Sequence, residues 1–120
     1  MKSTVIEIGS QALGDKEPII IFFGETVTEG LKAYSVIQKI VEPEEIELKK
    51  GDQLKIDDQV YSIEHVGSFA NANLNSIAHV TMVFDQVPEE DAIANGIYLS
   101  PETLPKIKVG TILDYISTGE

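Results

Sequence analysis

The sequence predicts an all-β protein that closes into a small β-barrel, with room for one short helix. Short apolar and β-branched runs alternate with turn residues through nearly the whole chain. Two segments, LKKGDQLKI at 48–56 and IKVGTILDY at 107–115, also share Lys, Gly and Leu at matching offsets. A pair of related β-units suits a closed barrel, which leaves no exposed sheet edge. Convergent turn chemistry explains the echo equally well, since Gly-Asp and Gly-Thr turns are common.

The first elements follow from β-branched composition and breakers. Residues 4–8 are short and β-branched, and IIIFF at 19–23 is apolar throughout, as expected of a fully buried strand. Residues 31–41 fit a helix in part, but their second half is rich in β-branched residues. We therefore predict a short turn at 28–33 and a strand at 35–41, which Pro43 ends.

A meander of alternating strands is predicted next. Apolar and polar residues alternate over 46–48, 54–56 and 60–65, with tight turns at KKGDQL and DDQ between them. The stretch FANANLNSI at 69–77 carries three asparagines and fits either a loop or a single helical turn.

The last third of the chain again has strand-like runs between loops. AHVTMVFD at 78–85 predicts a strand, 86–95 an acidic loop, and GIYLS at 96–100 a short strand. PETLP at 101–105 is a turn bounded by prolines, and 107–117 predicts a final hairpin or strand.

Composition predicts one cytoplasmic domain spanning 1–120. The chain has 120 residues, of which 42% are apolar, enough for a real core. Its formal net charge of −11 repels nucleic acid backbones and anionic lipid heads. The longest apolar run, 19–23, is too short to insert into a membrane, and MKSTVIEIGS has no secretory pattern. With no cysteine, no disulfide framework is available.

No cofactor or metal site is expected. The glycines are scattered singly, so no phosphate-binding glycine loop appears, and no arginine offers a bidentate phosphate clamp. The two histidines and the many carboxylates match no zinc or calcium spacing. GSFAN is not a nucleophile elbow.

The candidate reactive side chains are the two histidines, His65 and His79. His65 sits near the end of an alternating strand without an obvious partner, which favours a structural role. His79 shares a strand face with Thr81, and the pair could hydrogen-bond one ligand such as a phosphoryl group. A structural imidazole at the strand end is the alternative, and the pattern alone favours it.

One stretch resembles a known family. VGSFANANLNSIAHVTMVFD is similar to the VGS…NL…HVT..FD stretch of the glucitol/sorbitol-specific IIA components of the bacterial phosphotransferase system (PTS), and Leu31 and Tyr34 fit the approach to that family's active segment. The resemblance covers nearly the whole chain. The matching residues in that stretch are Val66, Gly67, Ser68, Asn73, Leu74, His79, Val80, Thr81, Phe84 and Asp85.

The resemblance implies a small cytoplasmic β-barrel that carries phosphate. Such proteins take a phosphoryl group from the phosphocarrier protein HPr onto a histidine and pass it to a membrane sugar permease, which phosphorylates the hexitol during uptake. Imidazole suits this role, because it is a nucleophile near neutral pH and its phosphoramidate transfers onward readily. An acidic surface also suits docking to a basic face of HPr.

This sequence departs from the family at the residue that matters most. Counted without gaps from Leu31 and Tyr34, the family's phosphohistidine falls on Gln38, and no histidine occurs between residues 1 and 64. A glutamine amide can hydrogen-bond phosphate but cannot carry it. Three hypotheses stay open: a regulatory relative that docks PTS proteins without carrying phosphate, a working carrier that uses His79 with support from Thr81, and a β-barrel ligand or adaptor module without phosphotransfer.

Overall fold

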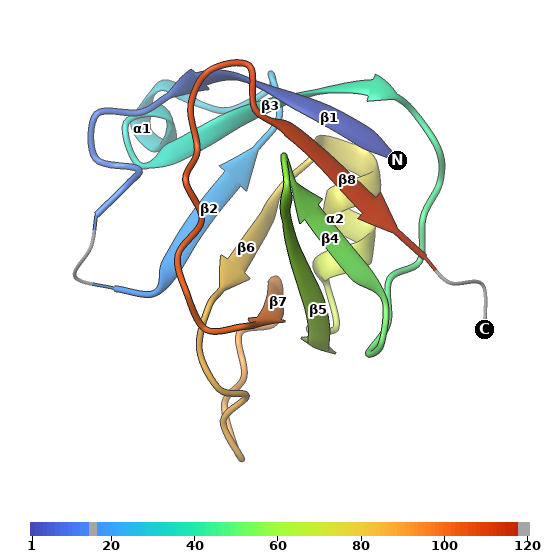
Figure 1. Cartoon of the computed structure of the whole chain (residues 1–120). Coiled ribbons are helices and arrows are strands. Elements are labelled where there is room, and N and C mark those ends of the chain that lie inside the picture. The colour runs from blue at the N-terminus through green and yellow to red at the C-terminus, as the bar shows by residue number, and fades with distance from the viewer. Residues whose placement is uncertain (15–16, 118–120) are drawn as a thin grey trace.

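The described part of the chain, residues 1–14 and 17–117 of a computed structural model, is one closed β-barrel (Figure 1). Its eight strands follow the order β1-β3-β2-β6-β7-β5-β4-β8 around the barrel, so the predicted all-β barrel is confirmed. No helix within these residues is long and apolar enough to span a membrane. The strands are β1 (Lys2–Ile8), β2 (Ile19–Phe23), β3 (Ser35–Glu42), β4 (Gln53–Ile56), β5 (Gln59–Val66), β6 (Val80–Val83), β7 (Gly96–Ser100) and β8 (Ile112–Ile116).

Alternation along the strands fills the barrel with one apolar core. Phe22 on β2, Val36 on β3 and Leu99 on β7 are fully buried and belong to one cluster. Full burial of such a side chain stabilises the fold by about 1.5–3 kcal/mol. Each strand contributes inward-facing residues to this core, and the helix residues Ala70 and Leu74 belong to the same cluster.

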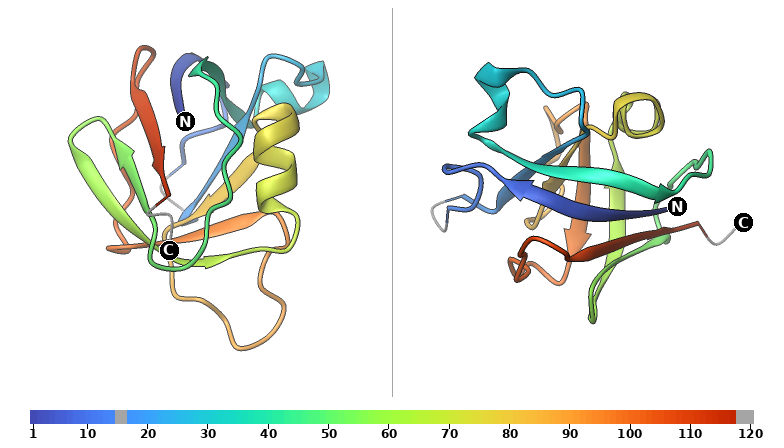
Figure 2. Two further views of the ribbon diagram at one scale, coloured as in Figure 1. Left: turned by 90° about the vertical axis from the view of Figure 1, so that its right-hand side faces the viewer. Right: turned by 90° about the horizontal axis from the view of Figure 1, so that it is seen from above.

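The described residues form two helices, whereas the sequence predicted at most one short helix. α1 (Glu29–Lys32) occupies the predicted turn at 28–33, and α2 (Ala70–Ile77) replaces the loop or single turn predicted at 69–77. Figure 2 shows both helices on the same side of the barrel. The prediction for 69–77 was too short because Asn is a weak helix former, whereas here burial of Ala70 and Leu74 stabilises two turns.

Other boundaries also differ from the prediction. Residues 46–48 form no strand, although Ile46 and Leu48 are buried as expected. Their backbone groups pair with two side chains of α2 instead. Asn75 accepts from Ile46 N (2.9 Å) and donates to its carbonyl (2.7 Å), and Asn71 does the same for Leu48 (2.8 and 2.9 Å). The predicted strands at 78–85 and 107–117 are shorter, at Val80–Val83 and Ile112–Ile116.

The barrel repeats one four-strand pattern twice. β2 and β3 pair in parallel, and so do β6 and β7. β1 pairs antiparallel with β3 and β5 with β7, and each pairing shifts register at the same place, between Val5 and Glu7 and between Ile63 and His65. Strands β1 to β4 therefore correspond in order to β5 to β8.

The two glycine turns noticed in the sequence belong to this repeat. Gly51 and Gly110 have φ angles of 98° and 97°, a left-handed conformation that favours glycine. In the first turn Lys49 N donates to Asp52 Oδ2 at 2.9 Å, and in the second Lys108 N donates to Thr111 Oγ1 at 3.0 Å. The turns lead into β4 and β8, which are neighbours in the barrel. Of the two explanations for the echo, the structure favours related halves.

Candidate functional site

Gln38 lies inside the barrel, with its side chain fully buried. Its Oε1 accepts hydrogen bonds from Ser3 Oγ at 2.5 Å and from Tyr115 Oη at 2.8 Å. Its Nε2 donates to the carbonyl oxygen of Ala78 at 2.9 Å. We call Ser3, Gln38 and Tyr115 the Gln38 cluster. Because these bonds engage both ends of the amide, its orientation is fixed.

Burial also fixes the state of the tyrosine in this cluster. Loss of solvation raises the pKa of Tyr115 well above its usual value, while the hydrogen bonds to Gln38 and Ser3 lower it to a smaller extent. The hydroxyl therefore stays protonated and remains a donor to Oε1. Since Ser3 donates to the same oxygen, the amide nitrogen of Gln38 must face Ala78.

The acceptor of that bond has an unusual backbone. Ala78 ends α2 with φ 54° and ψ 33°, the left-handed conformation, which costs a residue with a Cβ about 1–2 kcal/mol. Its own N–H donates to Leu74 O at 3.1 Å, and the next N–H, that of His79, donates to Asn73 O at 3.2 Å. The conformation of Ala78 turns the chain from the helix into β6 and sets where His79 begins.

The His79 ring is held on the outer side of the sheet. Its neighbours Val80 and Met82 point into the core, so alternation directs His79 and Thr81 outward. The ring stacks on Phe23 with the centroids 4.2 Å apart and the planes at 25°. Its Nδ1 lies 3.0 Å from the carbonyl oxygen of Phe22. Because a carbonyl only accepts, Nδ1 carries the hydrogen and donates it.

The other ring nitrogen, Nε2, faces solvent. In the described part of the chain, Nε2 makes no hydrogen bond, and no buried side-chain nitrogen or oxygen lacks a partner. Because Nε2 has no partner and His79 is not an exposed residue, Nε2 is at least partly accessible to solvent. With the hydrogen on Nδ1, Nε2 of the neutral ring has a free lone pair. This nitrogen has the electronic state that a nucleophile needs.

Asn95 links the two residues predicted to act together. Thr81 N donates to Asn95 O at 3.0 Å, and Asn95 Nδ2 lies 3.5 Å from the His79 carbonyl, where it donates. Asn73 Nδ2 in turn donates to Asn95 Oδ1 at 2.9 Å. The loop before β7 therefore fixes the start of β6 through the backbone of His79 and Thr81.

His65 lies on another part of the barrel. It sits on β5, which neighbours β4 and β7 but not β6, and its ring packs edge-on against Tyr98 with centroids 5.7 Å apart. The structure therefore separates the two histidines. Gln38 instead bonds to the residue that precedes His79, since Ala78 and His79 are the two residues between α2 and β6.

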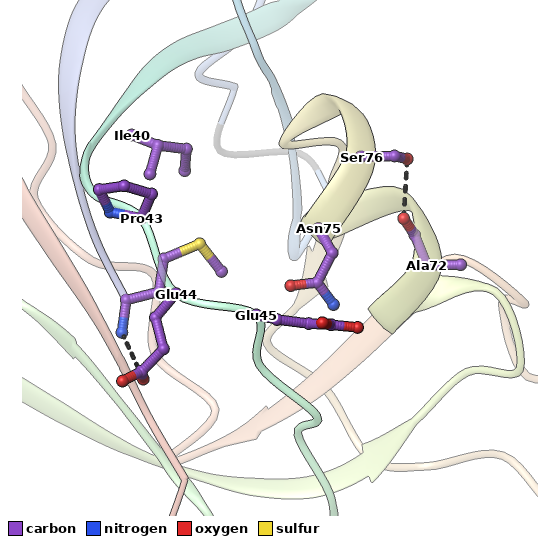
Figure 3. A pocket seen from close by; sticks show the side chains of 8 residues that line it. Ile40, Pro43, Glu44, Glu45, Ala72, Asn75 and Ser76 are labelled. Carbon is purple, nitrogen blue, oxygen red and sulfur yellow. Dashed lines mark hydrogen bonds and ion pairs between the residues drawn. The ribbon is translucent and has the colours of Figure 1, made fainter.

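A surface hollow of about 600 Å³ opens between α2 and the chain after β3 (Figure 3). Ile40 lies two residues beyond Gln38 on β3, and Met1 two residues before Ser3, so both belong to the layer above the Gln38 cluster. No grouping of three or more potential metal ligands occurs among the residues that the structure describes. The hollow is lined by Met1, Ile40, Pro43, Glu44, Glu45, Ala72, Asn75 and Ser76.

Sequence reasoning missed the partners of both candidate positions. Ser3 and Tyr115 contact Gln38 from opposite ends of the chain, and nothing local in the sequence connects them. A local signal did exist for Ser3, which alternates with Val5 on a β-branched run and so faces the core. Ala78 gave no signal, because alanine rarely adopts a left-handed conformation.

Comparison with known proteins identifies the family. A family model described as the PTS system glucitol/sorbitol-specific IIA component matches residues 1–114. The chain belongs to the glucitol/sorbitol-specific IIA family of the phosphotransferase system. A crystal structure of a PTS system IIA component from Enterococcus faecalis V583 is 51% identical and covers 98% of this chain and 100% of its own, with a TM-score of 0.94. No curated protein sequence gives a significant match.

Membership of the IIA family confirms the resemblance seen in the sequence. The matched region contains Gln38, His79 and Thr81. It also contains Ser3 and Ala78, the partners of Gln38 that precede residue 114, whereas Tyr115 follows the matched region directly. The roles of Gln38, His79 and Thr81 in this IIA component stay predictions.

Proposed function

We propose that this IIA component is a cytoplasmic phosphocarrier for hexitol uptake that carries the phosphoryl group on Nε2 of His79. It takes the group from HPr and passes it to the membrane sugar permease, with Thr81 hydrogen-bonding a phosphoryl oxygen. The family supports the phosphotransferase system and the hexitol. The observation that carries the choice of residue is the Nδ1–H···O bond to Phe22, which places the lone pair of the neutral ring on Nε2.

The transfer needs no cofactor in this scheme. The lone pair of His79 Nε2 forms a bond to phosphorus as the bond between phosphorus and the donor's histidine nitrogen breaks, and its electron pair returns to the donor. The phosphorylated ring keeps its hydrogen on Nδ1 and acquires positive character. The Phe22 carbonyl, 3.0 Å from Nδ1, stabilises that charge through a stronger hydrogen bond. Onward transfer to the permease reverses these changes.

Two properties of Gln38 argue against that position as the carrier. Its amide nitrogen is delocalised into the carbonyl and is not a nucleophile. Its side chain is fully buried and engaged in hydrogen bonds at both ends, so a docked protein would not reach it. The same buried amide favours a second candidate function, a regulatory or adaptor protein that binds PTS partners or a small ligand without accepting phosphate.

Phosphorylation by purified components separates the two functions. The protein is incubated with phosphoenolpyruvate, enzyme I and HPr, and intact mass is read before and after acid treatment. We expect one acid-labile, base-stable phosphoryl group that His79→Gln abolishes and that His65→Gln, the matched control, leaves in place. Absence of added phosphoryl mass on the wild-type protein supports the adaptor function instead. Label that survives in the His79→Gln protein contradicts the assignment to His79.

A second arm tests the sugar. The phosphorylated protein is mixed with membranes carrying a glucitol permease, and phosphate transfer to labelled glucitol is compared with transfer to mannitol. We expect transfer to glucitol. Transfer with neither hexitol contradicts the proposed place in hexitol uptake.

A further inference from the structure

The structure contains a buried hydrogen-bond relay from the barrel interior to the candidate histidine. It begins at the hydroxyls of Ser3 and Tyr115, passes through the amide of Gln38 and ends at the carbonyl of Ala78. The next residue is His79. The relay joins three strands of the barrel to the junction between α2 and β6, which are far apart in the sequence.

The relay is directional. Both hydroxyls donate to one end of the Gln38 amide, so the other end can only present its N–H groups. Ala78 has a left-handed backbone conformation, and its carbonyl oxygen accepts a hydrogen bond from one of these N–H groups at 2.9 Å. Ala78 is 7% exposed, so little water is available to replace this donor if the glutamine is removed. The bond is therefore a restraint on the junction, in addition to the backbone hydrogen bonds of Ala78 and His79 to α2.

The position of the junction determines the state of the His79 ring. The His79 ring forms the Nδ1–H···O bond to Phe22 and stacks on Phe23. Both contacts require the backbone of His79 to lie opposite the end of β2. If the junction relaxes, this bond lengthens and the hydrogen is free to move to Nε2. Nε2 would then lose its lone pair and with it the ability to accept a phosphoryl group.

We propose that Gln38 is a positioning residue for His79: its buried amide, oriented by Ser3 and Tyr115, holds the Ala78 carbonyl and thereby keeps the hydrogen of His79 on Nδ1. This inference rests on the proposed function for its catalytic meaning. The geometry that it describes exists whether or not phosphate is carried. Gln38 is the position at which the family resemblance expects the phosphorylated histidine. In this proposal it acts through Ala78, the residue directly before the reacting histidine.

The decisive variant removes the whole cluster. Gln38→Leu alone leaves two buried hydroxyls without an acceptor and could fail to fold. The triple variant Ser3→Ala, Gln38→Leu, Tyr115→Phe removes both hydroxyls together with their acceptor, so that only the Ala78 carbonyl loses a partner, which is less costly than stranding the hydroxyls as well. The control is Tyr61→Phe, which removes a tyrosine hydroxyl that donates to Thr103 O at 2.7 Å, away from His79.

The readout is the tautomer of His79, measured from its side-chain nitrogen chemical shifts by NMR. We expect the wild-type protein and Tyr61→Phe to show hydrogen on Nδ1 and the triple variant to show a mixture of tautomers. Phosphorylation of the triple variant by HPr should be slower by roughly 10- to 100-fold, as expected when a reacting group is misplaced. A folded triple variant with the wild-type tautomer overturns the proposal.

The two measurements keep the two proposals apart. If the wild-type protein accepts no phosphate, the proposed function fails, while the tautomer comparison still decides whether Gln38 positions His79. If His79 is phosphorylated at the same rate in the wild-type protein and the triple variant, and the tautomer is unchanged, the function stands and the positioning role is wrong.

Discussion

The two repeats of the barrel place different chemistry at equivalent positions. The polar Gln38 cluster corresponds to Tyr61, Leu99 and Ile56, which we call the Leu99 cluster. Both clusters are buried and occupy matching registers. In the Leu99 cluster two of the three side chains are apolar, and the Tyr61 hydroxyl donates to a nearby carbonyl, that of Thr103. In the Gln38 cluster the hydrogen bonds lead to the α2–β6 junction.

The difference between the Gln38 cluster and the Leu99 cluster bears on whether the barrel requires a buried amide. The matching positions of the other repeat hold a largely apolar cluster, so the barrel geometry by itself does not call for a buried amide. A buried polar group that contributes little beyond an apolar one is expected to have a specific task. The equivalent positions therefore offer matched substitutions, one in each repeat.

The largest effect is expected at a feature that both repeats share. A Cβ on Gly9 would lie 2.2 Å from Lys32 O, and one on Gly67 would lie 2.3 Å from Ala94 O. Gly9→Ala and Gly67→Ala should each lower the free energy of unfolding by about 3 kcal/mol or more, because backbone must move to relieve the clash. Urea denaturation measures this loss.

Gly30 supplies the control, since a Cβ there meets nothing within 4 Å. Gly30→Ala, in α1, should leave stability unchanged or raise it by up to about 1 kcal/mol. If only one of the two clashing variants were strongly destabilised, the repeats would not be equivalent at this crossing.

Exchanging the side chains of Gln38 and Leu99 between the two equivalent positions tests whether each cluster depends on its own residue. Gln38→Leu leaves the hydroxyls of Ser3 and Tyr115 without an acceptor. It should lower the free energy of unfolding by about 2–3 kcal/mol, because buried polar groups lose their partners. Leu99→Gln buries an amide where no polar cluster exists and should cost about as much. Urea denaturation again gives the values. A neutral Gln38→Leu would show that the cluster's hydrogen bonds contribute nothing to stability.

The smallest expected effect is that of Tyr115→Phe on stability at alkaline pH. Burial raises the pKa of Tyr115 above its usual 10.0, so the folded state holds this proton more tightly than the unfolded state. Its contribution is fully present below about pH 10 and is lost as the pH rises further, when the unfolded chain ionises. Urea midpoints measured between about pH 8 and about pH 11 should fall less steeply in Tyr115→Phe than in the wild-type protein.

Tyr61 gives the matched comparison for this titration. Its pKa is also raised by burial, and the hydrogen bond to Thr103 lowers it in part. Tyr61→Phe should flatten the alkaline decline less than Tyr115→Phe does, because the pKa of Tyr61 is raised less than that of Tyr115. Equal flattening in the two variants would mean that the Gln38 cluster is no drier than its counterpart.

Local patterns predicted the barrel, and contacts between distant residues explain what they missed. Alternation and β-branched runs located most strands, and Gly51 and Gly110 marked the related turns, because both signals act within a few residues. Helix α2 was underestimated because its stability comes from tertiary burial of Ala70 and Leu74. The strand predicted at 46–48 was wrong for a related reason, since its partners are side chains of that helix.

The candidate site rests on His79 and Thr81, which strand alternation places on one face, and their role stays a prediction. The departure at Gln38 was visible only through the family resemblance. That Gln38 bonds to the residue before His79 could not be predicted, because the acceptor is a backbone carbonyl, and any residue type supplies one. The left-handed Ala78 that presents this carbonyl leaves no pattern in the sequence either.

The two asparagines of α2 have a consequence for how the barrel assembles. The amides of Ile46 and Leu48 donate to Asn75 and Asn71 and have no strand beside them. Their exchange with deuterated solvent should therefore report the docking of α2, separately from barrel closure, which the amides of β4 and β5 report. These two amides act as a built-in probe of any loosening near His79, since α2 ends at the residue before Ala78.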